Sequence, residues 1–104
     1  MSIITTDSGV KKVYVVHAAF CEILTHPRRL EILDLLRAGE MSFRGLMEAT
    51  GMKKANLSQH LTFLREKGVV GERRTTDGLV FYLARPEVMQ AYDIMHALMA
   101  GVLG

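Results

Sequence analysis

Hydrophobic residues recur at helical spacing through the first third of the chain. Residues 10–24 are apolar on nearly every face, which predicts a helix buried on more than one side, although the β-branched cluster at residues 13–16 would also fit a short strand. In the next segment, Pro27 suits the first position of a helix and Gly39 suits its end. The pattern therefore predicts two consecutive helices. The apolar positions of the second are Leu30, Ile32, Leu33, Leu35 and Leu36.

The middle of the chain predicts two further helices joined by a tight turn. Ser42 suits the cap of a short helix over residues 43–50, and a longer helix is predicted over residues 53–67, where Gly68 ends it. The turn between them contains Gly51, the glycine that a helix-turn-helix needs in order to reverse direction. The longer helix has a narrow apolar stripe, so we expect only one edge of it to be buried. The stripe consists of Leu57, Leu61 and Leu64.

Beyond Gly68 the pattern changes to that of a β-hairpin and then of a last helix. Asp77-Gly78 separates two β-prone runs, which is typical of a hairpin turn, and the last helix is predicted to start near Pro86. Apolar residues in that helix are spaced by 4, 3, 4 and 3 positions, as in a coiled-coil seam. We therefore expect the first and last helices to form a homodimer. The predicted interface residues are Val13, Phe20, Val88, Tyr92, Met95, Met99 and Val102.

Length and composition limit the class of protein. The 104 residues suit one domain, 1–104, mainly α with a small β-hairpin, in which residues 1–9 are a polar tail. A single cysteine excludes a disulfide within the chain and a four-cysteine zinc site. No apolar run is long enough to span a bilayer, and the start has no secretory signal. The expectation is a cytoplasmic protein with no membrane partner.

Positive charge is concentrated in one third of the chain. Residues 44–74 contain seven basic and three acidic residues, a net charge of +4, whereas the rest of the chain carries −2. This stretch includes the predicted helix-turn-helix and the start of the hairpin. The helix after the turn presents small and amide side chains, and Asn and Gln pair well with the edge of adenine. This order of elements predicts binding to double-stranded DNA. The exposed face and its basic neighbours include Ala55, Asn56, Ser58, Gln59, Thr62 and Arg65.

The stretches HPRRLEILDLLRAGEMSFRGLMEATGMKKANLSQHLTFLREKGVV and ERRTTDGLVFYL resemble the ArsR/SmtB family of winged helix-turn-helix repressors. The most diagnostic part is Ser58-Gln59-His60-Leu61 followed by Leu64-Arg65-x-x-Gly68-Val69-Val70. The resemblance implies a homodimer that binds a palindromic operator and represses transcription until an effector releases it. It places Lys53, Lys54, Ala55, Asn56, Ser58, Gln59 and His60 on the recognition helix, and Arg73, Arg74, Thr76 and Gly78 on the wing. Leu79 stands where the family often has an arginine.

The metal sites found in members of this family lack their ligands in this sequence. Ser42 and Arg44 stand at the positions of two cysteines in one family site. Pro86, Val88, Met99 and Val102 stand at the positions of the ligands in another. No cofactor is therefore expected, and a metal or thiol-reactive effector is not supported by the known family sites. The remaining metal candidates are His17 with Cys21 and Asp93 with His96, spaced so that each pair shares a helix face. The alternatives for Cys21 are a buried structural residue and a redox sensor.

An enzyme and a protein-binding module are the alternatives to DNA binding. An enzyme is not expected, because the sequence shows no nucleophile–base pair, phosphate loop or paired carboxylates. The other hypothesis is a winged helix that binds proteins and does not bind DNA specifically. The cluster of Lys53, Lys54, Arg73 and Arg74 argues against it, since a protein-binding face need not be basic. The hypothesis is a transcriptional repressor.

Overall fold

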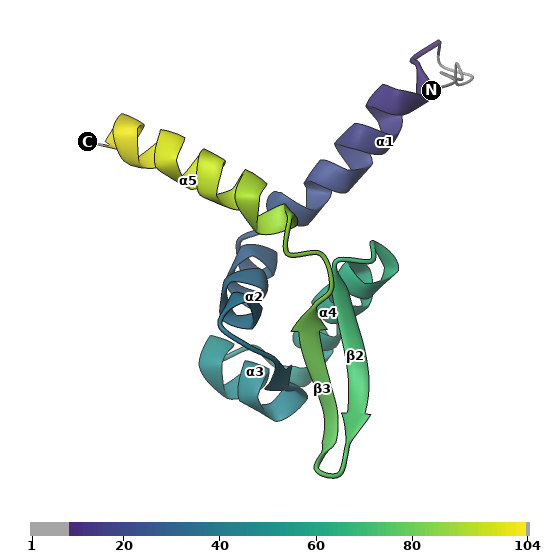
Figure 1. Ribbon diagram of the computed structural model, residues 1–104, viewed down its shortest axis with the longest axis vertical. Helices are drawn as coiled ribbons and strands as arrows, with labels where there is room; N and C mark the ends of the chain where they lie inside the picture. The colour runs from purple at the N-terminus through teal and green to yellow at the C-terminus, as the bar shows by residue number, and fades with distance from the viewer. Residues whose placement is uncertain (1–8, 104) are drawn as a thin grey trace.

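The computed structural model describes residues 9–103, so the predicted tail lies outside the described residues except for Gly9. The helices and the hairpin follow the order that the sequence predicts (Figure 1). They are α1 (Lys12–Cys21), a 3-10 turn (Glu22–Leu24), α2 (Pro27–Arg37), β1 (Met41–Ser42), α3 (Phe43–Thr50), α4 (Lys54–Glu66), β2 (Val70–Thr75), β3 (Gly78–Leu83) and α5 (Val88–Leu103).

Local capping explains where the central helices begin and end. The His26 side chain caps α2 by accepting a hydrogen bond from the backbone N–H of Arg28 at 3.2 Å. The Ser42 hydroxyl does the same for α3, accepting from Gly45 N–H at 2.9 Å. Gly51 ends α3 in the left-handed conformation, with a φ of 71°, which a side chain would strain. The caps at Ser42 and Gly51 confirm the sequence-based boundaries of α3.

Three strands form a small antiparallel sheet in the order β1–β3–β2. In the hairpin, Thr75 pairs with Gly78, so the two-residue connection is Thr76-Asp77, one residue earlier than the Asp77-Gly78 turn that the sequence predicted. The third strand, β1, pairs Met41 with Phe81 and was not predicted from the sequence. It joins the start of α3 to the hairpin. The wing is thereby attached to the helix-turn-helix.

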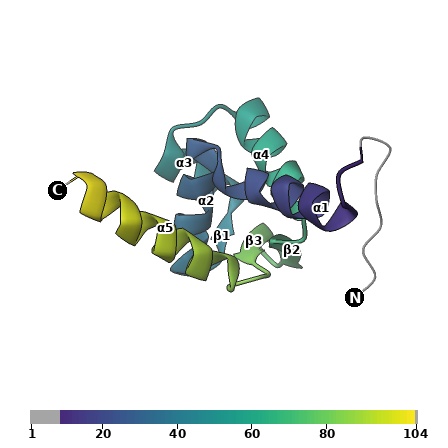
Figure 2. The same cartoon turned by 90° about the horizontal axis from the view of Figure 1, so that it is seen from above.

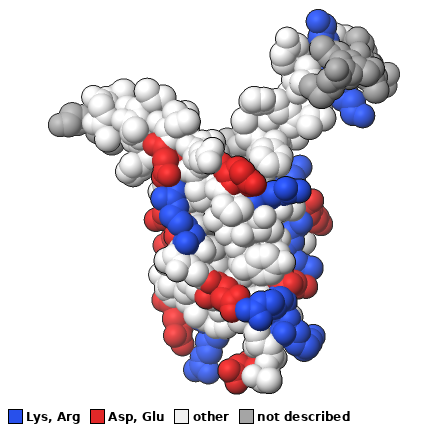
Figure 3. Space-filling model, viewed as in Figure 1, with Lys and Arg blue, Asp and Glu red and all other residues white. Residues whose placement is uncertain are grey.

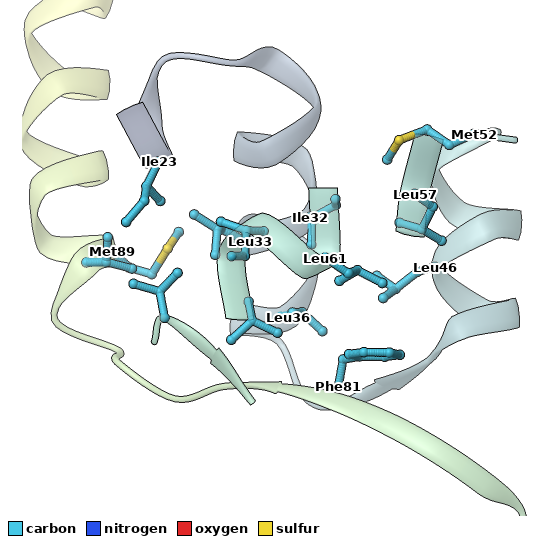
Figure 4. Close-up of a cluster of buried hydrophobic side chains, with 14 residues drawn as sticks. Ile23, Ile32, Leu33, Leu36, Leu46, Met52, Leu57, Leu61, Phe81 and Met89 are labelled. Carbon is cyan, nitrogen blue, oxygen red and sulfur yellow. The ribbon is translucent and has the colours of Figure 1, made fainter. Parts of the chain in front are cut away.

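The hydrophobic core lies between α2, α3, α4 and the sheet (Figure 4). Ile23 and Met89 lie at one end of the cluster, and Met52 and Leu57 lie at the other. Ile23 comes from the 3-10 turn after α1, and Met89 comes from the first turn of α5. The body therefore holds α1 at its C-terminal end and α5 at its N-terminal end. The core residues include Ile32, Leu33, Leu36, Leu46, Leu61, Leu64, Val69, Val70, Phe81 and Val88.

Helices α1 and α5 project from the same end of the body as two diverging arms (Figures 1 and 2). No residue of α1 is buried, so the prediction that this helix is buried on more than one side is wrong for the single chain. The reason is geometric, because α1 leaves the body after the 3-10 turn instead of packing on it. Along most of their length the arms carry no charged side chain on the face that Figure 3 shows. Their exposed apolar residues are Val10, Tyr14, Val15, Val16, Phe20, Ile94, Met95, Leu98, Met99 and Val102.

The predicted seam on α5 is only partly available to a second molecule. Val88 is buried in the core of its own domain, and Tyr92 packs against that core. Both positions therefore also serve the fold of the single chain, and their place in the dimer seam stays a prediction. Met95, Met99 and Val102 are exposed as expected. Ile94 and Leu98, which the spacing argument omitted, are 63% and 60% exposed and extend the apolar face. No helix among residues 9–103 is long and apolar enough to cross a membrane.

Candidate nucleic-acid interface

Helix α4 is held to the body by its apolar stripe, as the sequence predicted. Leu57 and Leu64 are fully buried, and Leu61 is nearly so. The opposite face is exposed and has no acidic residue until Glu66. The predicted DNA-binding residues that lie exposed in this region are Lys53, Lys54, Ala55, Asn56, Ser58, Gln59, Thr62 and Arg65, while His60 is half-buried. The structure thus leaves these small, amide and basic side chains open to a ligand.

The turn before α4 is fixed by a buried threonine. The Thr50 hydroxyl donates to the carbonyl of Leu46 at 2.7 Å and accepts from the backbone N–H of Met52 at 3.2 Å. Thr50 is 7% exposed and Met52 is 6% exposed, so both hydrogen bonds are shielded from water. They hold the end of α3 against the residue that leads into α4. The angle between the two helices is therefore set by local bonds as well as by the core.

Basic residues near α4 differ in whether a carboxylate neutralises them. Arg65 forms an ion pair with Glu72 at 3.0 Å, and Arg73 forms one with Glu40. Among the described residues, Lys53, Lys54 and Arg74 have no carboxylate within ion-pair distance. These three cations are therefore the ones most available to DNA phosphates. The sequence did not reveal this difference, because the carboxylate partners of Arg65 and Arg73 come from other elements.

The wing is a regular two-stranded hairpin with a polar tip. The Thr75 hydroxyl accepts from Asp77 N–H at 3.2 Å and donates to the carbonyl of Gly78 at 2.8 Å, which orders the turn. Thr76 is exposed and Gly78 is half-buried. Leu79 is 38% exposed, so the position that resembles a family arginine carries an apolar side chain near the tip. Arg74, paired with Leu79 across the hairpin, is the basic residue closest to the tip.

A shallow polar pocket of about 490 Å³ lies where α2 meets the start of α4. It is lined by Lys53, Asn56 and Gln59 of the predicted DNA-binding set, together with His26, Arg28 and His60. The rings of His26 and His60 are 4.5 Å apart between centroids. His26 caps α2, and neither His26 nor Arg28 is among the residues predicted from the sequence to bind DNA. Their positions before and after Pro27 hold no signal that they would face α4.

The metal candidates do not come together within one chain. Asp93 is occupied by an ion pair with Arg37 at 2.8 Å, and His96 stacks on Tyr92 with ring centroids 5.8 Å apart. His17 and Cys21 lie on the other arm, and Cys21 is exposed instead of buried among its apolar neighbours. Among the described residues, no three His, Cys, Asp or Glu side chains are grouped so that they could hold a metal ion. The structural reading of Cys21 as a buried residue is therefore wrong for the single chain.

A helix-turn-helix with an exposed polar second helix and a basic hairpin beside it defines a winged helix-turn-helix DNA-binding protein. Residues 26–72 match the bacterial regulatory proteins of the arsR family. The HTH-type transcriptional regulator Rv0081 of Mycobacterium tuberculosis is 34% identical over 91 residues, which cover 86% of this chain and 80% of that protein. The chain belongs to the arsR family, and it is a DNA-binding transcriptional regulator, not an enzyme.

Solved structures agree with this assignment. The crystal structure of Rv0081 matches with a TM-score of 0.81 and 32% identity, covering 90% of this chain and 95% of that one. The transcriptional repressor BigR from Xylella fastidiosa matches with a TM-score of 0.74 and 30% identity over 84% of this chain and 89% of its own. A winged helix-turn-helix domain of Mb0332 from Mycobacterium bovis, described as homodimeric, matches with a TM-score of 0.75 and 28% identity, covering 94% and 90%. The winged helix-turn-helix fold expected from the sequence is confirmed.

Proposed function

We propose that the protein binds a palindromic DNA operator as a homodimer, represses transcription there and is released by an effector. The observation that supports DNA contact most directly is the exposed face of α4, where Lys53 and Lys54 have no carboxylate partner among the described residues. The positive pole of the helix lies at the same end and adds to the attraction of phosphates. Amide side chains that suit base edges follow within the next two turns, at Asn56 and Gln59.

Dimerisation is supported by the arms. A groove of about 1010 Å³ runs between the two arms near the body. Its lining is mostly apolar, with Val13, Val16 and Phe20 of α1 and Val88 and Ala91 of α5, and it also includes the charged residues Lys12, Lys67, Arg85 and Glu87. An apolar groove of this size, continuous with exposed apolar faces, suits helices of a second copy. A two-fold dimer carries two recognition helices related by the same symmetry, which explains a palindromic operator.

Repression is supported by the name of one relative and not by that of another. BigR is described as a repressor, whereas HlyU of Vibrio cholerae, 32% identical over 75 residues, is described as an activator. Repression is the simpler outcome for a small dimer. A dimer bound to an operator that overlaps a promoter blocks polymerase and needs no contact with it. Since the proposed partner is the bacterial chromosome, we also infer a cytoplasmic location.

The experiment is a gel shift with the DNA upstream of the protein's own gene at two salt concentrations. Specific binding is expected to weaken steeply with salt, because each neutralised phosphate releases condensed counterions. A duplex of random sequence serves as the control and should bind at least about 1000-fold more weakly. Equal binding to both duplexes, or no binding, would contradict the proposal and favour a protein-binding winged helix.

A further inference from the structure

The polar pocket between α2 and α4 has the chemistry of an anion site. Its polar side chains are the guanidinium of Arg28, the ammonium of Lys53, the amides of Asn56 and Gln59 and the imidazoles of His26 and His60. No carboxylate lines it. Lys53, the N-cap residue of α4, makes no side-chain capping hydrogen bond, so the first N–H groups of this helix also lack a side-chain partner. Every charged group in the lining is therefore a cation.

Hydrogen bonds at the start of α2 hold one side of this pocket in place. Arg28 Nη1 donates to the carbonyl of Thr50 at 3.0 Å, which ties the start of α2 to the end of α3. The same nitrogen contacts Glu31 at 2.8 Å, so the nearest carboxylate on α2 is already paired. His26 Nδ1 accepts the N–H of Arg28 and closes the cap. Arg28 and His26 are thus held in place before a ligand arrives.

We infer that this pocket binds one phosphodiester of the operator backbone, and that His60 takes up a proton when the phosphate enters. The inference rests on the proposed function, since it assigns a role to α2 within the same DNA complex. It makes operator binding stronger at lower pH. It also assigns His26 and Arg28, which precede the helix-turn-helix, to the DNA-binding surface.

His60 is the group that can change its charge. The Nδ1 atom of His26 already accepts a hydrogen bond that caps α2. His60 is half-buried against that ring, and the two rings are tilted by 55°. The charged or titratable groups around it are His26, Arg28 and Arg29 from α2 and Lys53 from its own helix, while Glu31 is paired with Arg28.

The direction of the effect follows from these neighbours. Burial lowers the pKa of His60 below its usual value, and the electrostatic effect of the neighbouring His26, Arg29 and Arg28 lowers it further. The DNA-free protein therefore disfavours the charged form of His60. A phosphate in the pocket supplies negative charge and raises this pKa. The gain in affinity is complete below the pKa of the free protein and is lost as the pH rises through the pKa of the complex.

The first test measures the affinity for an operator duplex, selected from a random-sequence pool, at about pH 6 and about pH 8 and constant ionic strength. The wild-type protein should bind about 3- to 10-fold more tightly at the lower pH, and His60→Gln should change less than about twofold. Asp34→Asn is the control, because Asp34 is exposed on α2 and does not line the pocket, and it should keep the pH dependence of the wild type. An equal pH dependence in His60→Gln overturns the inference.

A second variant tests the histidine pair in a protein that keeps the cap of α2 and therefore its fold. His26→Asn keeps a side chain that caps α2 and removes the imidazole beside His60. Its pH dependence should remain, with the midpoint moved to higher pH, because one cause of the lowered pKa of His60 is gone. A midpoint that does not move would contradict the role given to the histidine pair.

The last test locates the phosphate. Neutral methylphosphonates are placed one at a time along each half-site, and one position should weaken the wild-type protein by about tenfold at the lower pH but have little further effect on His60→Gln. Inorganic phosphate at matched ionic strength is the second arm. Displacement of DNA by inorganic phosphate, with no sensitive backbone position, would assign the pocket to free phosphate and overturn the inference. Failure to select any duplex would overturn the proposed function itself.

Discussion

At the scale of single residues, ion pairs decide which cations meet DNA. Arg73 and Arg74 are adjacent in the sequence and belong to the same strand, yet only Arg73 is paired, with Glu40. A paired arginine has to exchange its carboxylate for a phosphate, which reduces the net gain on binding. Arg74 makes no such exchange. Composition alone treats the two residues as equal, whereas the structure separates them.

Arg74→Ala is therefore expected to weaken binding to all DNA sequences alike and to lower the salt slope by about one. Arg73→Ala should have a smaller effect, and Glu40→Gln should strengthen binding because it frees Arg73. Salt titrations of operator affinity for the three variants check this. A larger loss for Arg73→Ala than for Arg74→Ala would show that the ion pair does not persist in solution.

Gln59 is the exposed amide on α4 most suited to base readout, since its neighbours on the exposed face are small. Gln59→Ala should reduce discrimination between operator and random DNA by about 1–3 kcal/mol if the amide pairs with a base. Lys54→Ala, its matched control, should weaken both duplexes equally and lower the salt slope by about one. Competition binding with the two duplexes measures the difference. Equal losses for Gln59→Ala would mean that it does not read bases.

At the scale of elements, the sequence predicted each helix and the hairpin, because capping residues and glycines mark their ends. Helix α4 is one residue shorter at each end than expected, with Lys53 and Lys67 as its caps. Strand β1 was missed because two residues cannot show an alternating pattern. The seam on α5 was predicted from the spacing of apolar residues alone. Spacing does not show that Val88 is buried in the core of the same chain or that Tyr92 packs against that core.

The site was less predictable than the fold for a related reason. Residues on α4 could be assigned from one helical face, and their exposure agrees with that assignment. The partners that modify this face come from elsewhere in the chain: Glu40 lies before β1, Glu72 lies on β2, and His26 and Arg28 lie at the start of α2. Contacts between elements leave no periodic signal, so only the three-dimensional arrangement reveals them.

The turn within the helix-turn-helix gives a prediction at this scale. Thr50→Val keeps the shape of the side chain but leaves the buried N–H of Met52 without its acceptor. The free energy of unfolding should fall by about 1–3 kcal/mol. Thr62→Val, on the exposed face of α4, is the control and should change it by less than about 0.5 kcal/mol. Denaturant unfolding measures both, and an unchanged midpoint for Thr50→Val would show that water replaces the hydroxyl.

At the scale of the whole molecule, the arms lie at the opposite end from the tip of the wing. The tip of the wing lies far from the diverging ends of α1 and α5 (Figure 1). Arg37 links these regions, because it donates to Asp93 of α5 from the last turn of α2 and lies over the Tyr92 ring at 5.3 Å. Any change in the angle of α5 therefore acts on the body that carries α4. In a dimer, that angle sets the distance between the two recognition helices.

Because α5 leaves its apolar face uncovered in the single chain, the strongest test at this scale introduces charge on that face. Met95 and Met99 are 55% and 52% exposed, and in a dimer built through the arms they become buried. Met95→Asp with Met99→Asp would then place unpaired carboxylates in an apolar interface, which costs several kcal/mol. We expect a folded monomer in sedimentation that has lost most of its operator affinity, since one recognition helix cannot span a palindrome.

The matched control adds the same charge elsewhere on the helix. Gln90→Asp with Ala97→Asp places two carboxylates on α5 away from the face of Met95 and Met99, because positions 97 and 95 are about 200° apart around a helix. This variant should remain a dimer and bind the operator as the wild type does. A methionine variant that still sediments as a dimer would move the interface to α1 alone. In that case the apolar face of α5 would need a different explanation, with Ile94 and Leu98 as its most exposed members after Val102.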